Sequence, residues 1–246
     1  MKYLFDFAFL PDEELKTHDC RLVVDLLRAS TQITVFFDAG GGTLLPVTGV
    51  DEAKKLRASL GSGWKLMGER GGLSAPGFDF GNSPSELIHT GAPSGAVITT
   101  SNGTRAIVRA VKDCREVYIA CARNAESAAW KAVASGTKIG IIASGEGGSF
   151  SFEDTVCSGL LIERMLTLAP QNGGTEMELT DGAIAALDLW HKYGRDFTAF
   201  CMATEHGKKL CDLGFAEDVK FCCAIDATER APYITRYKNM TAIKSE

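Results

Sequence analysis

The feature of this chain that most constrains its fold is the alternation of short apolar runs with segments of helical periodicity. Five runs, several of them rich in Val and Ile, predict β-strands at residues 22–26, 65–68, 96–100, 117–120 and 139–143. Helices are predicted after most of these runs, at residues 51–60, 104–112, 126–134, 153–168 and 181–193. Strands that alternate with helices form layered α/β folds, and continuous apolar strands are typical of sheets covered on both faces. The chain is therefore predicted to be a layered α/β protein.

The pattern of apolar residues also predicts the structure of the first ten residues and the buried face of the last predicted helix. Residues 1–10 are mostly apolar, but Asp6 interrupts them and no small-residue cleavage pattern follows, so they predict a first strand rather than a targeting signal. In the helix predicted at residues 181–193, apolar residues at three-to-four spacing predict a stripe that faces the core. This stripe consists of Ala183, Ile184, Leu187 and Trp190.

The composition limits the class of protein. The 246 residues are 45% hydrophobic and 23% charged, which is ordinary globular usage and fits one domain over residues 1–246 or two closely packed halves. A formal charge of −5 argues against a nucleic-acid partner, and the absence of an apolar run of about 18 residues argues against a membrane span. Eight cysteines without a Cys-x-x-Cys pair favour reduced thiols in the cytoplasm over a disulfide framework or a zinc site. A homodimer is the base-rate expectation for such a protein.

Polar and glycine-rich loops follow the predicted strands, which is where ligands bind in open α/β sheets. At the end of the first of these strands, Asp25 is followed by Arg28, Ser30 and Thr31. A carboxylate there can bind magnesium while the Arg and the hydroxyls bind phosphate oxygens, although an Asp–Arg ion pair that closes the strand end explains the pattern equally well.

The next loop carries Glu69 and Arg70, and a glycine-rich stretch at residues 77–84 with Asn82 follows it. Such a stretch allows backbone N–H groups to converge on an anion, but turn formation alone accounts for much of it.

Two later loops add the same kinds of group. Residues 99–105 run from a strand through an Asn-Gly turn into a helix, which places hydroxyls, backbone donors and Arg105 at a helix N-terminus. Residues 143–154 form a Gly/Ser loop that leads into the adjacent carboxylates Glu153 and Asp154, a candidate site for a hard cation. Ordinary helix capping is the alternative for both loops.

Several familiar signatures are absent. The sequence has no Cys-x5-Arg, no Arg-His-Gly, no Asp-x-Asp-x-Thr, no phosphate-binding Gly-x4-Gly-Lys-Ser/Thr and no intact Gly-x-Gly-x-x-Gly after a strand. Kinases, dinucleotide enzymes and the better-known phosphatases are therefore disfavoured. The four histidines are scattered and predicted to be surface or structural residues, with His206, placed just before a predicted helix, as the mild exception.

Taken together, in this order and spacing, the loops resemble the 2-phosphosulfolactate phosphatase family. The resemblance spans nearly the whole chain and rests on residues 24–31, 68–71, 77–84, 99–105, 124–125, 151–154, 205–207, 213–218 and 221–222. Two conservative departures are Ser30, where Thr is more usual, and Phe152, where an aliphatic residue is usual.

The resemblance implies a magnesium-dependent hydrolysis of (2R)-2-phospho-3-sulfolactate to sulfolactate and phosphate, a step in making coenzyme M. It also implies an α/β/α arrangement with a mixed, largely parallel sheet. Catalytic roles are expected for Asp25, Arg28, Asn102 and Arg105, and magnesium binding for some of Asp25, Glu69, Glu153 and Asp154. Substrate-binding roles are expected for Ser30, Thr31, Arg70, Asn82, Thr100, Gly103, Thr104 and Gly145.

Two questions stay open at this point. The attack on phosphorus can come from a metal-activated water or from Asp25 through a phosphoaspartyl intermediate. The resemblance also leaves open a broader phosphatase for 2-phospho-hydroxy acids, or an anion-binding module without catalysis.

Overall fold

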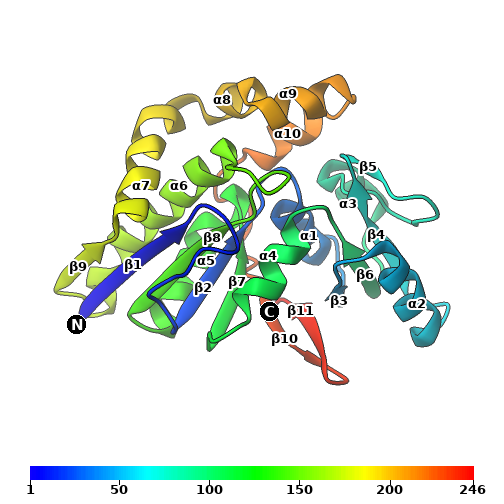
Figure 1. Cartoon of the computed structure of the whole chain (residues 1–246), viewed down its shortest axis with the longest axis horizontal. Helices are drawn as coiled ribbons and strands as arrows, with labels where there is room; N and C mark the ends of the chain where they lie inside the picture. Colours follow the sequence, from blue (N-terminus) through cyan, green and yellow to red (C-terminus); the bar gives the residue numbers. More distant parts are fainter.

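The computed structural model describes residues 1–246, with eleven β-strands in a single mixed sheet flanked by helices (Figure 1). The strands are β1 Lys2–Ala8, β2 Cys20–Val24, β3 Thr43–Pro46, β4 Lys65–Arg70, β5 Leu73–Ser74, β6 Gly95–Thr99, β7 Glu116–Ala120, β8 Lys138–Ala143, β9 Glu176–Leu179, β10 Tyr233–Tyr237 and β11 Met240–Lys244. The helices are α1 Ala29–Asp38, α2 Val50–Leu60, α3 Pro84–Thr90, α4 Gly103–Ala110, α5 Ala125–Ser135, α6 Phe152–Leu168, α7 Asp181–Tyr193, α8 Phe197–Ala203, α9 Glu205–Asp212 and α10 Ala216–Cys222. Short 3₁₀ helices lie at Ala122–Asn124, Ala169–Asn172 and Gly194–Asp196.

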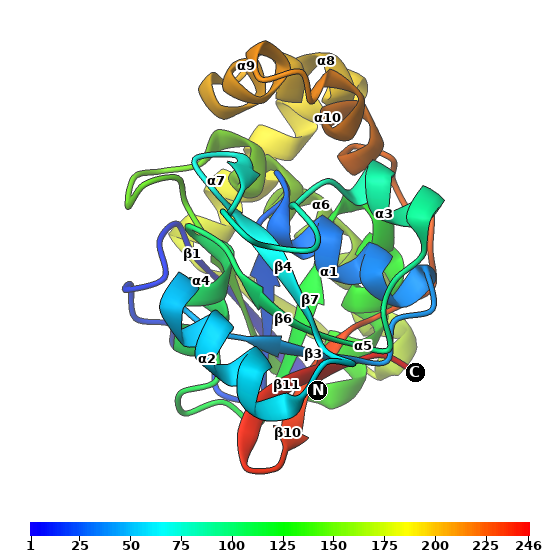
Figure 2. The same ribbon diagram turned by 90° about the vertical axis from the view of Figure 1, so that its right-hand side faces the viewer.

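The sheet consists of two parallel blocks joined by an antiparallel hairpin. Its strand order is β5-β4-β6-β3-β11-β10-β7-β2-β8-β1-β9. The first block holds β7, β2, β8, β1 and β9, and the second holds β3, β6 and β4. The C-terminal hairpin β10–β11 is drawn in red in Figure 2. It pairs with each block through a single residue pair, Tyr233 with Tyr118 and Ile243 with Leu44.

Helix α1 lies between the two blocks and is buried along nearly its whole length. Its side chains Ile33, Phe36 and Phe37 share one core with Val23 of the first block and Ile98 of the second. Ser30, Thr31 and Thr34 are tolerated there because each hydroxyl donates a hydrogen bond to a backbone carbonyl inside the protein.

Helices cover the outer faces of both blocks. Helices α5, α6 and α7, with α8 to α10 beyond them, pack on the first block, whereas α2 packs on the second. The alternation in β2 fits this arrangement, because Leu22 and Val24 face the outer helices while Val23 faces α1. The predicted layered α/β fold with a mixed, largely parallel sheet is confirmed.

All predicted strands and helices are present, with small shifts in their bounds. The largest shift is in β2, which ends at Val24, so Asp25 is the first residue beyond the strand. The stripe predicted in α7 is wrong at Ile184, which is 47% exposed, because Ala186 and not Ile184 joins Ala183 in the core. His206 lies in the first turn of α9 rather than before the helix. No helix has the length and apolar character needed to cross a membrane.

Candidate active site

A polar cavity of about 230 Å³ collects residues that follow strands of both blocks. Asp25 follows β2 and Glu146 follows β8 in the first block, while Glu69 lies in β4 and Asn102 follows β6 in the second. The other lining residues are Leu27, Arg28, Gly71, Gly72, Asn82, Ser101, Gly147, His206, Lys209 and Leu210. We call this space the inner cavity.

The sheet has to turn sharply for these residues to meet. Three successive antiparallel pairings, through the hairpin β10–β11, reverse the strand direction between the two blocks. In a flat sheet this reversal would place the carboxyl ends of the two blocks at opposite edges. Because only one residue pair joins the hairpin to each block in the strand pairing, the sheet can twist there and bring both sets of strand ends to one cavity.

Asp25 is held at the cavity wall by the turn between β2 and α1. Its Oδ1 accepts a hydrogen bond from Ala29 N at 3.0 Å. The Ser30 hydroxyl accepts a hydrogen bond from the backbone N–H of Asp25 and donates one to the backbone carbonyl of Asp25. A Cβ at Gly103 would lie 2.7 Å from Asp25 Oδ2, so glycine is needed for this approach of α4. Burial raises the pKa of Asp25 to about 6, because it outweighs the Ala29 hydrogen bond and the attraction of His206.

Glu69 and Asn82 bring two further oxygen-bearing groups to the inner cavity. Glu69 accepts hydrogen bonds from Gly72 N at 2.8 Å and from Ser101 N at 2.7 Å, so it fixes two of the loops. The Ser101 hydroxyl is a third donor to Glu69. Because a carboxylate can accept about four hydrogen bonds, Glu69 keeps one acceptor position free. The Oδ1 atom of Asn82 is buried and has no hydrogen-bond partner in the protein. An unsatisfied buried oxygen beside two carboxylates is suited to a cation.

The predicted magnesium ligands Glu153 and Asp154 do not line the inner cavity. Asp154 lies behind the Asp25 turn, where it accepts hydrogen bonds from Leu26 N at 2.8 Å and from Ser144 Oγ at 3.0 Å. Burial, together with the nearby charge of Asp25, raises the pKa of Asp154 well above its usual range. No three His, Cys, Asp or Glu side chains converge as a metal cluster, and of the four acids from which the ligands were predicted the inner cavity brings together Asp25 and Glu69.

Arg28 lines the inner cavity, but its guanidinium is committed to the protein. It forms a buried ion pair with Asp218 at 2.7 Å, donates to Gly72 O at 2.6 Å and lies over the ring of Phe215. This arrangement agrees with the ion-pair interpretation that the sequence left open, except that the partner is Asp218 of α10 and not Asp25. The long-range contact ties α10 to the Gly71–Gly72 loop.

The two other predicted anion-binding arginines lie away from the inner cavity. The Arg105 side chain is 60% exposed and its nearest acid is Asp12 at 3.9 Å. The Arg70 guanidinium is bound to neighbouring parts of the protein: it donates hydrogen bonds to Thr99 Oγ1 at 2.8 Å and to the backbone carbonyls of Glu69 and Thr48. The structure therefore does not bring Arg70 or Arg105 to the carboxylates, because successive side chains of a strand or helix start point in different directions.

Several predicted substrate-binding residues hold the loops in shape. The Ser30 and Thr31 hydroxyls donate to the carbonyls of Asp25 and Leu26, and Thr100 and Thr104 bond to each other across the α4 N-terminus. Gly145 has a φ of +67°, and a Cβ there would lie 2.5 Å from Ser149 O. None of these five residues lines the inner cavity, whereas Asn82 and Asn102 do.

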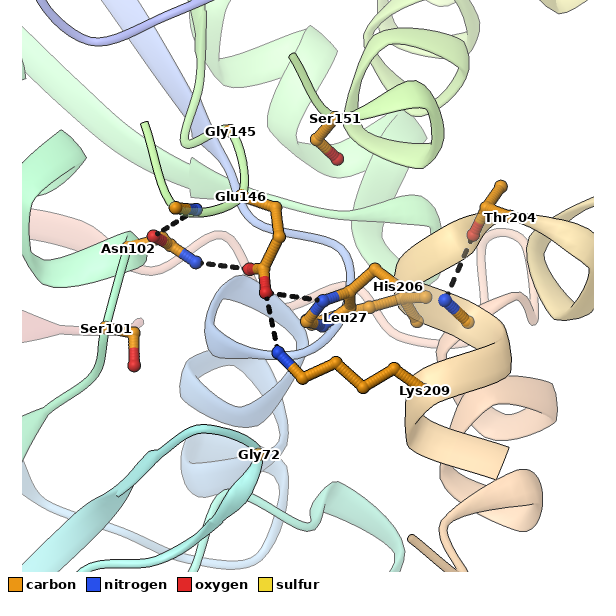
Figure 3. Close-up of polar contacts among 12 residues, drawn as sticks. Leu27, Gly72, Ser101, Asn102, Gly145, Glu146, Ser151, Thr204, His206 and Lys209 are labelled. Atoms are coloured by element: carbon orange, nitrogen blue, oxygen red, sulfur yellow. Dashed lines mark hydrogen bonds and ion pairs between the residues drawn. The ribbon is translucent and has the colours of Figure 1, made fainter. Parts of the chain in front are cut away.

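Asn102 belongs to a cluster in the cavity whose other members, Glu146, His206 and Lys209, received no role from the sequence. Glu146 receives hydrogen bonds from Asn102 Nδ2 at 2.6 Å and Lys209 Nζ at 3.0 Å, and pairs with His206 Nδ1 at 3.1 Å (Figure 3). The neighbouring His206 and Lys209 side chains lower the pKa of Glu146 to about 2, against the opposing effect of burial. Burial alone would lower the pKa of His206, but Glu146 and the more distant acids raise it overall.

The signal for this cluster was weak in the sequence. Glu146 lies between glycines and reads as a turn residue, and His206 and Lys209 are about 60 residues away along the chain. The i, i+3 spacing of His206 and Lys209, which predicts that both lie on one face of a helix, was the one indication in the sequence.

The fold and this cavity together define an α/β protein with a small polar cavity where strand ends of both blocks meet, a typical position for an active site. A model of the family described as 2-phosphosulpholactate phosphatase matches residues 8–236. The chain belongs to that family, and it is by class a phosphoric monoester hydrolase.

Three relatives illustrate the match, each carrying the name "Probable 2-phosphosulfolactate phosphatase". The protein of Clostridium acetobutylicum is 34% identical over 91% of this chain and 92% of its own length. The protein of Pseudothermotoga lettingae is 32% identical over 93% and 95%, and that of Deinococcus radiodurans is 34% identical over 91% and 90%.

Proposed function

We propose that this enzyme hydrolyses (2R)-2-phospho-3-sulfolactate to 3-sulfolactate and phosphate with the help of Mg²⁺. The observation that carries the proposal is the meeting of Asp25, Glu69 and the unpartnered Asn82 oxygen in one cavity of a family member. The substrate is that named for the relatives, and the eight free cysteines fit a cytoplasmic location. The place in coenzyme M synthesis rests on the family resemblance.

The donor set of the inner cavity fits Mg²⁺. Magnesium in phosphate-transferring sites is held by one or two carboxylates together with substrate oxygens and water, so a cluster of three acidic ligands is not required. Asp25 and Glu69 supply the carboxylates and Asn82 supplies a neutral oxygen. Bound there, the ion would offset the negative charge that develops on the phosphoryl oxygens.

Asp25 is the residue of the chain most suited to the chemical step. Its carboxylate is buried at the cavity wall, and its pKa of about 6 lets it gain or lose a proton near neutral pH. As a carboxylate it can attack phosphorus, which forms an acyl phosphate and breaks the P–O ester bond; the leaving oxygen takes a proton from water, and a second water then hydrolyses the acyl phosphate. Alternatively, it can take a proton from a water that attacks phosphorus and displaces the same ester oxygen. Rapid quenching with labelled substrate separates the routes, since only the first leaves label on the Asp25 tryptic peptide.

The direct test of the function is phosphate release from purified protein. We expect release from 2-phosphosulfolactate with Mg²⁺, its loss with EDTA and its return when Mg²⁺ is restored. Phospholactate and phosphoglycolate are the comparison substrates. Equal rates on all three would replace the sulfonate-specific proposal by a broader phosphatase, and no release from any of them would favour an anion-binding module.

The activity should rise with pH in the region where Asp25 ionises. Because both routes need its carboxylate, kcat/KM is expected to increase between about pH 5 and 7, with a midpoint near 6 at limiting Mg²⁺. A bound cation favours the ionised form, so saturating Mg²⁺ should move the midpoint to lower pH. A profile that stays flat across this range at both Mg²⁺ concentrations would contradict the assignment of Asp25.

A further inference from the structure

The inner cavity carries an anion-binding arrangement beside the residues proposed to hold Mg²⁺. Three donors from two elements converge on one carboxylate, that of Glu146: Asn102 before α4, and His206 and Lys209 in α9. Glu146 Oε2 accepts a hydrogen bond from Asn102 and Oε1 accepts one from Lys209, while His206 Nδ1 lies 3.1 Å from Oε1 as an ion-pair partner (Figure 3). Donors that converge in this way form a binding site for any carboxylate or sulfonate of suitable size.

Two of these donors are positioned by the protein independently of Glu146. The His206 imidazole is oriented by the 2.8 Å contact of Nε2 with Leu27 O, in which the ring nitrogen donates. Asn102 is oriented by Gly147 N, which donates to its Oδ1 at 3.1 Å and thereby turns Nδ2 toward the anion. The donors would therefore keep their direction if another anion replaced the Glu146 carboxylate.

Space is available on the far side of Glu146. A second cavity of about 430 Å³, which we call the outer cavity, shares Glu146, His206 and Lys209 with the inner cavity. It is also lined by Ser149 and Ser151, whose hydroxyls can receive a displaced carboxylate.

The movement requires only the side chain. Glu146 and Ser149 exchange two backbone hydrogen bonds across Gly147 and Gly148, both at positive φ, so the backbone forms a closed two-residue turn. The side chain alone has three rotatable bonds, and it is about one-third exposed.

We propose that Asn102, His206 and Lys209 bind the acid group that the substrate carries beside its phosphate, and that Glu146 occupies this site until the substrate displaces it. The inference rests on the proposed function, because that substrate carries a carboxylate and a sulfonate. The acid site and the Asp25–Glu69 side line the same cavity, so one small molecule can engage both. Glu146 thereby selects for ligands whose own acid group can take its place.

The test is the affinity for 3-sulfolactate, the product of the proposed reaction, measured by calorimetry without turnover. Glu146→Gln keeps the shape of the side chain but removes the negative charge that competes with the ligand, so the dissociation constant of 3-sulfolactate should fall about tenfold. Lys209→Met removes a cation from the site, so the constant should rise about tenfold. Lys208→Met, an exposed neighbour that lines neither cavity, should match the wild type.

Substrates identify the acid group that is recognised. Ethyl phosphate has no second acid, phospholactate has a carboxylate, and 2-phosphooxyethanesulfonate has a sulfonate. Lys209→Met should raise KM only for esters that carry the recognised group. If it raised KM for ethyl phosphate by the same factor, Lys209 would bind the phosphate itself and the proposal would be overturned.

The two proposals fail in different ways. If 2-phosphosulfolactate is not hydrolysed but both variants still shift sulfolactate affinity in opposite directions, the function is wrong and the acid site stands. If it is hydrolysed while Glu146→Gln and Lys209→Met bind sulfolactate like the wild type, the function stands and the acid site is wrong.

Discussion

The Asp25→Asn variant is expected to lose about 10²- to 10⁴-fold in kcat/KM and, without Mg²⁺, to be more stable than the wild type at pH 7. The amide oxygen can still accept from Ala29 N, so the turn between β2 and α1 is preserved. What the variant removes is a charge that the buried site disfavours.

The pKa of Asp25 gives the size and the sign of this effect. Burial raises it from 3.8 to about 6, which corresponds to about 3 kcal/mol of lost native stability at pH 7. Because the native state binds the proton more tightly than the unfolded state, wild-type stability falls as pH rises through this window. Asn lacks the titration, so the difference between the two proteins should be near zero at about pH 3.5 and greatest above about pH 6.

Urea unfolding at several pH values, with and without Mg²⁺, measures the effect. Added Mg²⁺ should stabilise the wild type at pH 8, should do so less at pH 5, and should stabilise Asp25→Asn weakly at both. Asp188→Asn, at an exposed position of α7, is the matched control and should change neither activity nor stability. Equal Mg²⁺ stabilisation of the wild type and Asp25→Asn would remove Asp25 from the cation site.

The second large effect is expected from Arg28→Met, which should lower the free energy of unfolding by about 3–5 kcal/mol. Arg28 and Asp218 are each 1% exposed at the side chain, so the substitution leaves a buried, uncompensated carboxylate. Met restores much of the packing on Phe215, so the loss comes mainly from the charge.

A double variant tests this reasoning. Asp218 also accepts from Ser83 Oγ at 2.8 Å and from Ser85, and an Asn oxygen can keep these bonds. Arg28→Met with Asp218→Asn should therefore recover part of the stability that the single variant loses. Lys220→Met, which breaks an exposed pair with Glu217 on the same helix, should leave the urea midpoint unchanged. If Arg28→Met lowered the free energy of unfolding as little as Lys220→Met does, the ion pair of Arg28 with Asp218 would not stabilise the fold.

Asp25 and Arg105 show which part of the site could be predicted from the sequence and which part could not. Asp25 was identified because an acid near the end of an apolar strand lies at a predictable edge of a parallel sheet. Arg105 was chosen by similar reasoning, at a helix start after a strand, yet its side chain points to solvent. The position of a backbone in the sheet order can be predicted from local pattern, but the direction of a long side chain depends on what packs around it.

The elements missed at the sequence level have physical causes as well. Helix α1 is buried on all sides, so it shows no amphipathic stripe, and its Ser, Thr and Val residues are weak helix formers. The hairpin β10–β11 turns at Lys238-Asn239, both at positive φ, where an Asn-Gly turn would have been the recognisable signal. That hairpin then decides how the two sheet blocks are joined.

By itself, the sequence determined the layered α/β fold, about half of the strands and helices, and the strand ends and loops that carry Asp25, Glu69, Asn82 and Asn102, because periodicity and strand-end chemistry are local properties. Only the tertiary structure decided which of the charged residues meet. The reversal through β10–β11 brings the strand ends of two blocks together, Asp218 takes the guanidinium of Arg28, and α9 adds His206 and Lys209 from far along the chain. These contacts depend on long-range packing, which no local pattern of residues encodes.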